Sequence, residues 1–126
     1  LHIRGEHSRG DLAQYLSKNG CPCEGLVVYT QTAKSLSTHV MEAVLGGVPF
    51  ILPLFSPRTA TLLLEQITPA PGSHIVAMSK SVAEPFYKFD QFGMTVVDFP
   101  RSGEMLTAVC IAYKATQRLE TRADDD

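Results

Sequence analysis

The chain has 126 residues, of which 44% are hydrophobic and 19% charged, so it can bury the core of one domain of ordinary size and is not expected to be disordered. Its 11 basic and 13 acidic residues give a formal net charge of -2, which argues against nucleic acid or an anionic membrane surface as the main partner. No apolar run approaches the roughly 20 residues that span a bilayer and no signal peptide is recognisable, so we expect a cytoplasmic protein with no membrane partner.

Short β-type runs alternate with helical patterns along the first part of the chain. Residues 1–3 predict the end of a strand, and residues 8–19 predict a helix that stops before Gly20. Residues 26–29 are rich in β-branched and aromatic side chains and predict a second strand. Residues 37–45 carry an apolar stripe at helical spacing, which predicts a second helix followed by a glycine turn.

The same alternation continues to the end of the chain. Residues 48–55 form a near-continuous apolar run that predicts a strand, although Pro49 and Pro53 interrupt it. A helix is then predicted from Ser56, an N-cap residue, with Pro57 at the first helical position. The remaining elements are predicted as strands at residues 74–78 and 94–99, helices at residues 79–92 and 104–119, and a frayed tail at residues 122–126.

Strands that alternate with helices predict βαβ units, and therefore an α/β fold with a mostly parallel sheet and right-handed crossovers. Because the strands are apolar on both faces, helices should flank the sheet on both sides. Ligands of such sheets bind beyond the carboxyl ends of the strands, where the next helices begin. The strand-to-helix junctions are therefore the first places to search for a site.

Four such junctions combine small residues, backbone N–H groups at a helix start and one cation; they are residues 3–5, 55–59, 78–81 and 99–103. Each is suited to an anion, because the first N–H groups of a helix and its dipole both favour negative charge. A serine N-cap is also an ordinary structural feature, so a single junction is explained by helix capping alone. Several junctions on one sheet edge would instead favour a ligand with several negative groups. No phosphate-binding loop motif is present, which favours carboxylates over nucleotide phosphates.

The cysteines and Tyr29 are two further candidates for chemical roles. Cys21 and Cys23 are one residue apart, with Cys110 far along the chain, and this spacing predicts neither a metal site nor an unstrained disulfide. Tyr29 ends a strand and so stands at the edge where ligands bind, where its hydroxyl could assist a leaving group. The alternative role for Tyr29 is an aromatic side chain that closes the core.

The order of several short motifs resembles the uroporphyrinogen-III synthase family from residue 1 to about residue 113. These motifs are Arg4-Gly5, Arg9-Gly10-Asp11-Leu12, Val27-Val28-Tyr29, Phe55-Ser56-Pro57-Arg58-Thr59-Ala60, Val76-Ala77-Met78-Ser79-Lys80-Ser81-Val82-Ala83, and Gly93-Met94 to Pro100 followed by Leu106. The resemblance implies two flavodoxin-like α/β domains with the active site between them. It also implies a cofactor-free lyase that uses no metal and cyclises hydroxymethylbilane to uroporphyrinogen III with inversion of the last pyrrole ring.

The same resemblance implies the site residues. The linear tetrapyrrole substrate carries eight carboxylates, and Tyr29 matches the tyrosine that is favoured to assist loss of the hydroxyl. Residues implied to hold the substrate are Arg4, Gly5, Ser56, Pro57, Arg58, Thr59, Ser79, Lys80 and Ser81. Val82 departs from the family pattern, because many relatives have threonine there, so that hydroxyl would have to come from Ser81 or be absent.

The chain is about half as long as a full synthase, and the family's chain path predicts how it divides. Residues 1–32 would be the C-terminal part of the second domain, residues 33–120 most of the first domain, and residues 121–126 a disordered acidic tail. Such a fragment would have half a cleft and exposed sheet edges, so we expect little activity and dimerisation or strand exchange. The full-length protein is expected to be a monomer.

The alternative hypothesis is a non-catalytic α/β module that binds a small polyanionic ligand. Such a module would need the anion-binding junctions but not a tyrosine directed at a reacting carbon. A receiver-like signalling domain is less well supported, because Asp98 has no obvious acidic partner at a strand end.

Overall fold

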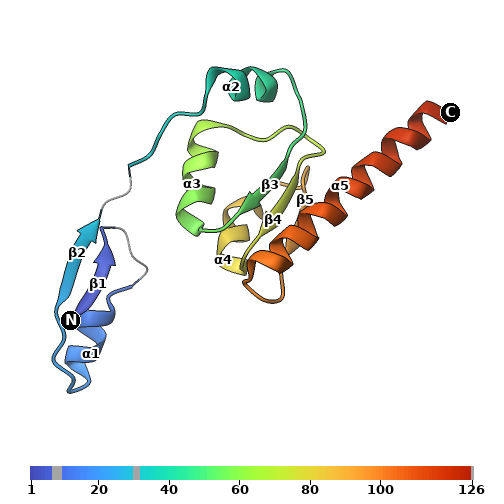
Figure 1. Cartoon of the computed structure of the whole chain (residues 1–126). Helices are drawn as coiled ribbons and strands as arrows, with labels where there is room; N and C mark the ends of the chain where they lie inside the picture. The colour runs from blue at the N-terminus through green and yellow to red at the C-terminus, as the bar shows by residue number, and fades with distance from the viewer. Residues whose placement is uncertain (7–9, 30–31, 126) are drawn as a thin grey trace. The chain divides into compact units, whose positions relative to one another are not determined.

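The computed structural model describes residues 1–6, 10–29 and 32–125, with the backbone alone at residues 5, 28, 29 and 125. The chain forms two compact units, Leu1–Lys34 and Ser35–Asp126, which we describe separately (Figure 1). In the described part, no helix has the combination of length and apolar character needed to cross a membrane.

The first unit is a small βαβ arrangement. Strand β1 (His2–Gly5) pairs in parallel with β2 (Gly25–Tyr29), and helix α1 (Leu12–Lys18) lies between them in sequence. The Asp11 side chain caps α1 by accepting a hydrogen bond from the backbone N–H of Gln14 at 2.9 Å. After α1 the chain turns at Gly20, whose φ of +83° is readily adopted only by glycine.

The first unit buries little apolar surface. Ala13 is its one buried hydrophobic residue in the described part of the chain. Leu12 and Tyr15, apolar residues of α1 three positions apart, are 48% and 66% exposed, and Ile3 is 61% exposed. The first unit therefore offers too little apolar surface to bury these side chains.

The second unit is a three-stranded parallel sheet with helices on both faces. Its strands are β3 (Ile51–Leu54), β4 (His74–Ala77) and β5 (Gly93–Val96), hydrogen-bonded in the order β3-β4-β5. The other elements of this unit are α2 (Thr38–Leu45), α3 (Pro57–Gln66), α4 (Lys80–Ala83), the 3-10 helix η1 (Glu84–Phe86) and α5 (Ser102–Asp125). This architecture confirms the α/β fold class and the parallel pairing predicted from the sequence.

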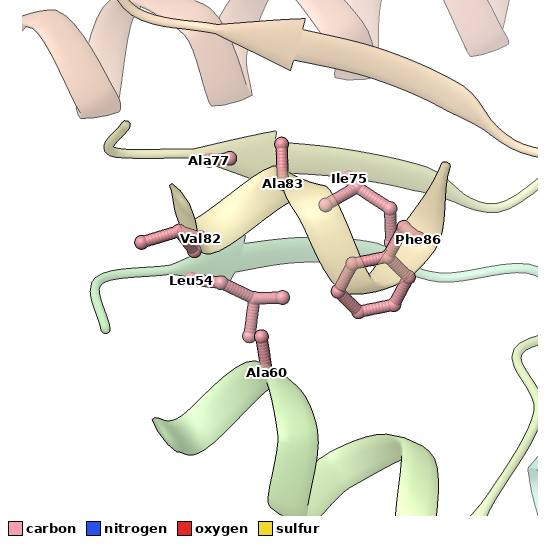
Figure 2. Close-up of a cluster of buried hydrophobic side chains, with 7 residues drawn as sticks. All are labelled: Leu54, Ala60, Ile75, Ala77, Val82, Ala83 and Phe86. Atoms are coloured by element: carbon pink, nitrogen blue, oxygen red, sulfur yellow. The ribbon is translucent and has the colours of Figure 1, made fainter. Parts of the chain in front are cut away.

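The central strand β4 divides the core into two layers, because successive side chains of a strand point to opposite faces. On one face, Ile75 and Ala77 pack with buried residues of α3, α4 and η1, including Phe86 (Figure 2). On the other face, Val76 packs against Met105 and Ala108 of α5. The continuous apolar character of this strand thus reflects burial on both faces.

Two helices differ most from the sequence prediction, and α1 begins at Leu12, within the helix predicted at residues 8–19. The helix predicted at residues 79–92 is a single α-helical turn, α4, followed by η1 with Pro85 in its first turn. Proline cannot donate the backbone hydrogen bond that would continue α4, whereas the first turn of η1 needs no such donor. In contrast, α5 continues to Asp125 through residues that were predicted as a frayed tail.

Stability of the second unit should fall in acid because of His74. Its Nε2 atom lies 2.7 Å from Thr95 Oγ1, and a Cβ atom at Gly93 would overlap the His74 ring. Burial lowers the pKa of His74 below 6.5. The unfolded chain therefore binds the proton first, so stability is complete above pH 6.5 and declines as pH falls toward the pKa of the folded protein.

Urea unfolding of the wild-type chain and of His74→Gln across this pH range checks the prediction. The free energy of unfolding of the variant should depend less steeply on pH below 6.5. Equal slopes for the two proteins would contradict a role for His74.

Candidate functional site

The carboxyl ends of the three strands bring three of the predicted junctions to one edge of the sheet. The Met78 N–H donates to the Leu54 carbonyl at 3.0 Å, and the Val97 N–H donates to the Ala77 carbonyl at 3.1 Å. These bonds hold the ends of β3, β4 and β5 level with one another. The starts of α3, α4 and α5 therefore follow neighbouring strands, as ligand sites of parallel sheets require.

The first junction is built by the N-cap of α3. Ser56 Oγ accepts a hydrogen bond from the Thr59 N–H at 3.1 Å and donates one to Thr59 Oγ1 at 2.8 Å. Pro57 occupies the first turn, where its missing N–H costs nothing. Both features confirm the predicted helix start. Thr59 is exposed and Arg58 is half-buried beside it, so this junction offers hydroxyl, guanidinium and helix-start groups to an anion.

The N-cap can be tested through stability. Replacing Ser56 by alanine should lower the free energy of unfolding by about 1 kcal/mol, because it removes the acceptor of the Thr59 N–H. Ser35, an exposed residue before α2, is the control, and Ser35→Ala should change the unfolding free energy by less than about 0.5 kcal/mol. Equal effects in urea unfolding would show that the cap does not stabilise α3.

The second junction, at the start of α4, depends less on the helix dipole for its positive charge. Ser79 Oγ accepts a hydrogen bond from the Val82 N–H at 3.4 Å and lies 3.0 Å from Ser81 Oγ. Because α4 has only four residues, its dipole adds little, and the exposed Lys80 ammonium supplies the charge. Lys80 and the paired hydroxyls are therefore the groups that could hold a carboxylate here.

A cleft of about 380 Å³ lies between the ends of β4 and β5. It is lined by Met78, Ser79, Lys80, Val96, Val97, Asp98 and Pro100. The cleft thus contains two of the residues predicted from the sequence, Ser79 and Lys80, and places the Asp98 carboxylate beside the same cavity. Sequence reasoning did not include Asp98 in the site; the available signal was its position near the carboxyl end of a predicted strand.

The third junction begins α5. The Met105 N–H donates to the Arg101 carbonyl at 3.1 Å, so the helix is entered at Arg101. The Arg101 guanidinium lies over the Phe99 ring, 5.5 Å from its centroid. This contact keeps a cation at the sheet edge by packing it on an exposed aromatic ring.

The remaining predicted residues belong to the first unit. Gly5 and Tyr29 are register partners at the carboxyl ends of β1 and β2, so their backbones lie side by side. Arg4 Nη1 donates to the Glu6 carbonyl at 3.3 Å. The Tyr29 side chain lies outside what the structure describes. The Arg4-Gly5 junction is on the separate β1-β2 sheet, whereas the other three junctions follow the strands of the β3-β4-β5 sheet.

The cysteines are unpaired thiols in the structure. Cys21 and Cys110 are exposed and Cys23 is half-buried. Across residues 1–6, 10–29 and 32–125, no group of three or more His, Cys, Asp and Glu side chains is placed to hold a metal ion.

The fold and the site define a parallel α/β protein whose strand ends and helix starts meet at the edge where sheets of this type usually bind ligands. Residues 1–106 match the family model of uroporphyrinogen-III synthase HemD, so the chain belongs to the uroporphyrinogen-III synthase family. Searches of curated proteins and of solved structures found no match. The family match confirms the resemblance noted in the sequence and assigns the chain to an enzyme family of tetrapyrrole and heme biosynthesis.

Proposed function

We propose that this chain forms part of a site that cyclises hydroxymethylbilane to uroporphyrinogen III, with inversion of the last pyrrole ring. The family match supports the reaction class. The observation that supports this substrate is the row of neighbouring helix starts at one sheet edge. Lys80 lies at the second of these junctions and Arg101 at the third. A substrate with many carboxylates needs such a row of donors, because each carboxylate oxygen accepts hydrogen bonds from N–H, hydroxyl and ammonium groups.

In this proposal, the junctions at Ser56–Thr59 and at Ser79–Ser81 each hold a carboxylate arm. At the second junction, Ser79 Oγ and Ser81 Oγ are already 3.0 Å apart. Two neighbouring hydroxyl groups can turn their hydrogens toward one carboxylate, which would then also meet the Lys80 ammonium. Ser81 would thereby supply the hydroxyl that many relatives carry at the position of Val82.

Tyr29 would assist the chemical step. Loss of water breaks the bond between the terminal methylene carbon and its hydroxyl oxygen, and a phenol can donate a hydrogen bond to that departing oxygen. The Arg4-Gly5 junction would lie near, since Gly5 is the register partner of Tyr29. The remaining catalysis would come from holding the two ends of the flexible tetrapyrrole at reacting distance.

Substrate binding by Lys80 should appear in the KM. In a synthase that contains these residues as its C-terminal portion, Lys80→Gln should raise KM roughly tenfold with little change in kcat, because the ammonium contributes uniform binding of a carboxylate. Lys114→Gln is the matched control, since Lys114 is an exposed lysine on α5, twelve residues beyond the start of that helix. An unchanged KM for Lys80→Gln would remove Lys80 from the proposed site.

We also propose that residues 1–32 and 33–120 belong to the second and first synthase domains, respectively, so that the 126 residues alone carry half of the cleft. The isolated chain should then give little or no type III product from hydroxymethylbilane. The assay is the isomer ratio of the uroporphyrinogen formed, with the spontaneous type I product as the background. Full turnover by the isolated chain would refute this assignment.

A further inference from the structure

The outer edge of β5 carries backbone groups that are available for another strand. The Gly93 N–H donates to the Ser73 carbonyl at 2.9 Å, and the Val97 N–H donates to the Ala77 carbonyl at 3.1 Å. The odd-numbered residues of β5 therefore bond to β4. In a parallel ladder the intervening residues face the other way. Met94 and Val96 therefore direct their N–H and carbonyl groups outward, and no strand of the described chain pairs with them.

The opposite edge of the sheet lacks a donor at its centre. The backbone N–H of His74 donates to the Phe50 carbonyl, and that of Met78 donates to the Leu54 carbonyl. The even-numbered residues of β3 therefore bond to β4. Pro53 falls between them, at an outward-facing position, and has no N–H to donate. Proline at such a position is a common means of preventing strand addition. Of the two edges, only that of β5 offers a donor at its centre.

A groove runs beside this free edge. It has a volume of about 250 Å³ and is lined by residues 95–98 and by residues of α5, among them Glu104, Thr107 and Ile111. Ile111 is 64% exposed and supplies an apolar wall. The charged residues that line the groove are Asp98 and Glu104, and no basic residue lines it. Its charge therefore complements a cationic occupant.

We propose that the outer edge of β5 binds an extended basic peptide segment by strand addition. Main-chain hydrogen bonds would form with Met94 and Val96, an apolar side chain of the peptide would cover Ile111, and a lysine or arginine would meet Asp98 and Glu104. A second copy of the chain is the less suitable occupant, because pairing two β5 edges would bring the acidic residues of both copies into one interface.

The test uses a capped seven-residue peptide of alternating valine and lysine, with the same peptide carrying glutamate in place of lysine as control. Backbone amide shifts of the 126-residue chain report the site. We expect the lysine peptide to shift Met94 and Val96, whose N–H groups face outward, more than Gly93 and Val97. Shifts confined to other segments, or equal binding of the glutamate peptide, would overturn the proposal.

Two variants separate the backbone and charge contributions. Val96→Pro removes an outward donor while leaving the Val97 bond to β4 in place, and it should abolish peptide binding. Asp98→Asn combined with Glu104→Gln leaves the backbone unchanged and should weaken binding about tenfold, so it carries the test if the proline variant does not fold. Unchanged affinity in the charge variant overturns the proposal. So does self-association of the chain that Val96→Pro prevents, in the absence of peptide binding.

Discussion

Replacing Tyr29 with phenylalanine should lower the rate of type III product formation about 100-fold in a synthase that contains this chain. The substitution retains the aromatic ring and removes only the hydroxyl, so the loss would measure the proposed hydrogen-bond donation to the departing oxygen, an effect of about 100-fold to 10,000-fold for a positioned acid. The measurement is the rate of hydroxymethylbilane consumption together with the ratio of type III to type I isomers. The effect should fall on kcat, because the interaction forms as the bond breaks.

The control for Tyr29→Phe is Tyr15→Phe, which changes a tyrosine on α1 that is 66% exposed. It should leave the rate unchanged. If Tyr29→Phe is also without effect while Lys80→Gln still weakens binding of the tetrapyrrole, the result favours a module that binds a polyanion without transforming it. Type I product alone from the intact protein would contradict the proposed reaction.

Phe86→Ala should be the most destabilising single truncation in the second unit, at about 3–5 kcal/mol. Phe86 has no exposed surface and makes an edge-to-face contact with Phe92, with ring centroids 6.3 Å apart. Its ring lies beside Ile75 of β4 in the layer drawn in Figure 2, and so joins η1 to the sheet. The loss is large relative to the 5–15 kcal/mol that usually stabilises a domain, so the variant should be partly unfolded at moderate temperature.

Urea unfolding of Phe86→Ala is best compared with Phe99→Ala. Phe99 is 57% exposed, so its truncation removes little buried surface and should cost less than about 1 kcal/mol. Comparable losses in the two variants would show that the layer of α3, α4 and η1 does not provide the principal core.

Much of the local structure followed from residue types that act on their neighbours. Ser56 and Pro57 predicted the start of α3, and the structure confirms both the cap and the position of the proline. Gly20 and Gly47 follow helices and have φ values of +83° and +79°, the left-handed conformation that commonly ends a helix and that glycine adopts readily. The strands at β3, β4 and β5 were predicted because β-branched and aliphatic runs between helical patterns are typical of parallel sheets.

The error at residues 79–92 has a physical cause. The apolar side chains of Val82 on α4 and Phe86 on η1 recur at helical spacing, and both are buried in the cluster that includes Ile75 of β4. However, α4 and η1 together turn the chain within seven residues, Lys80–Phe86. Packing of Phe86 into the sheet, with Pro85 unable to extend the helix, outweighs the local periodicity. Periodicity records which side chains face the core, not how long a helix continues.

The amino-acid sequence alone determined a near-neutral α/β chain with helix starts at the ends of its strands, because composition, caps and periodicity act over a few residues. Tertiary structure decided which of those starts meet. Strand order places Lys80 and Asp98 around one cleft, since β4 and β5 are neighbours, and assigns Arg4-Gly5 to a different sheet. Register also decided that Pro53 removes a donor from one edge of the sheet while Val96 presents one at the other, a consequence of hydrogen bonding between segments far apart in sequence.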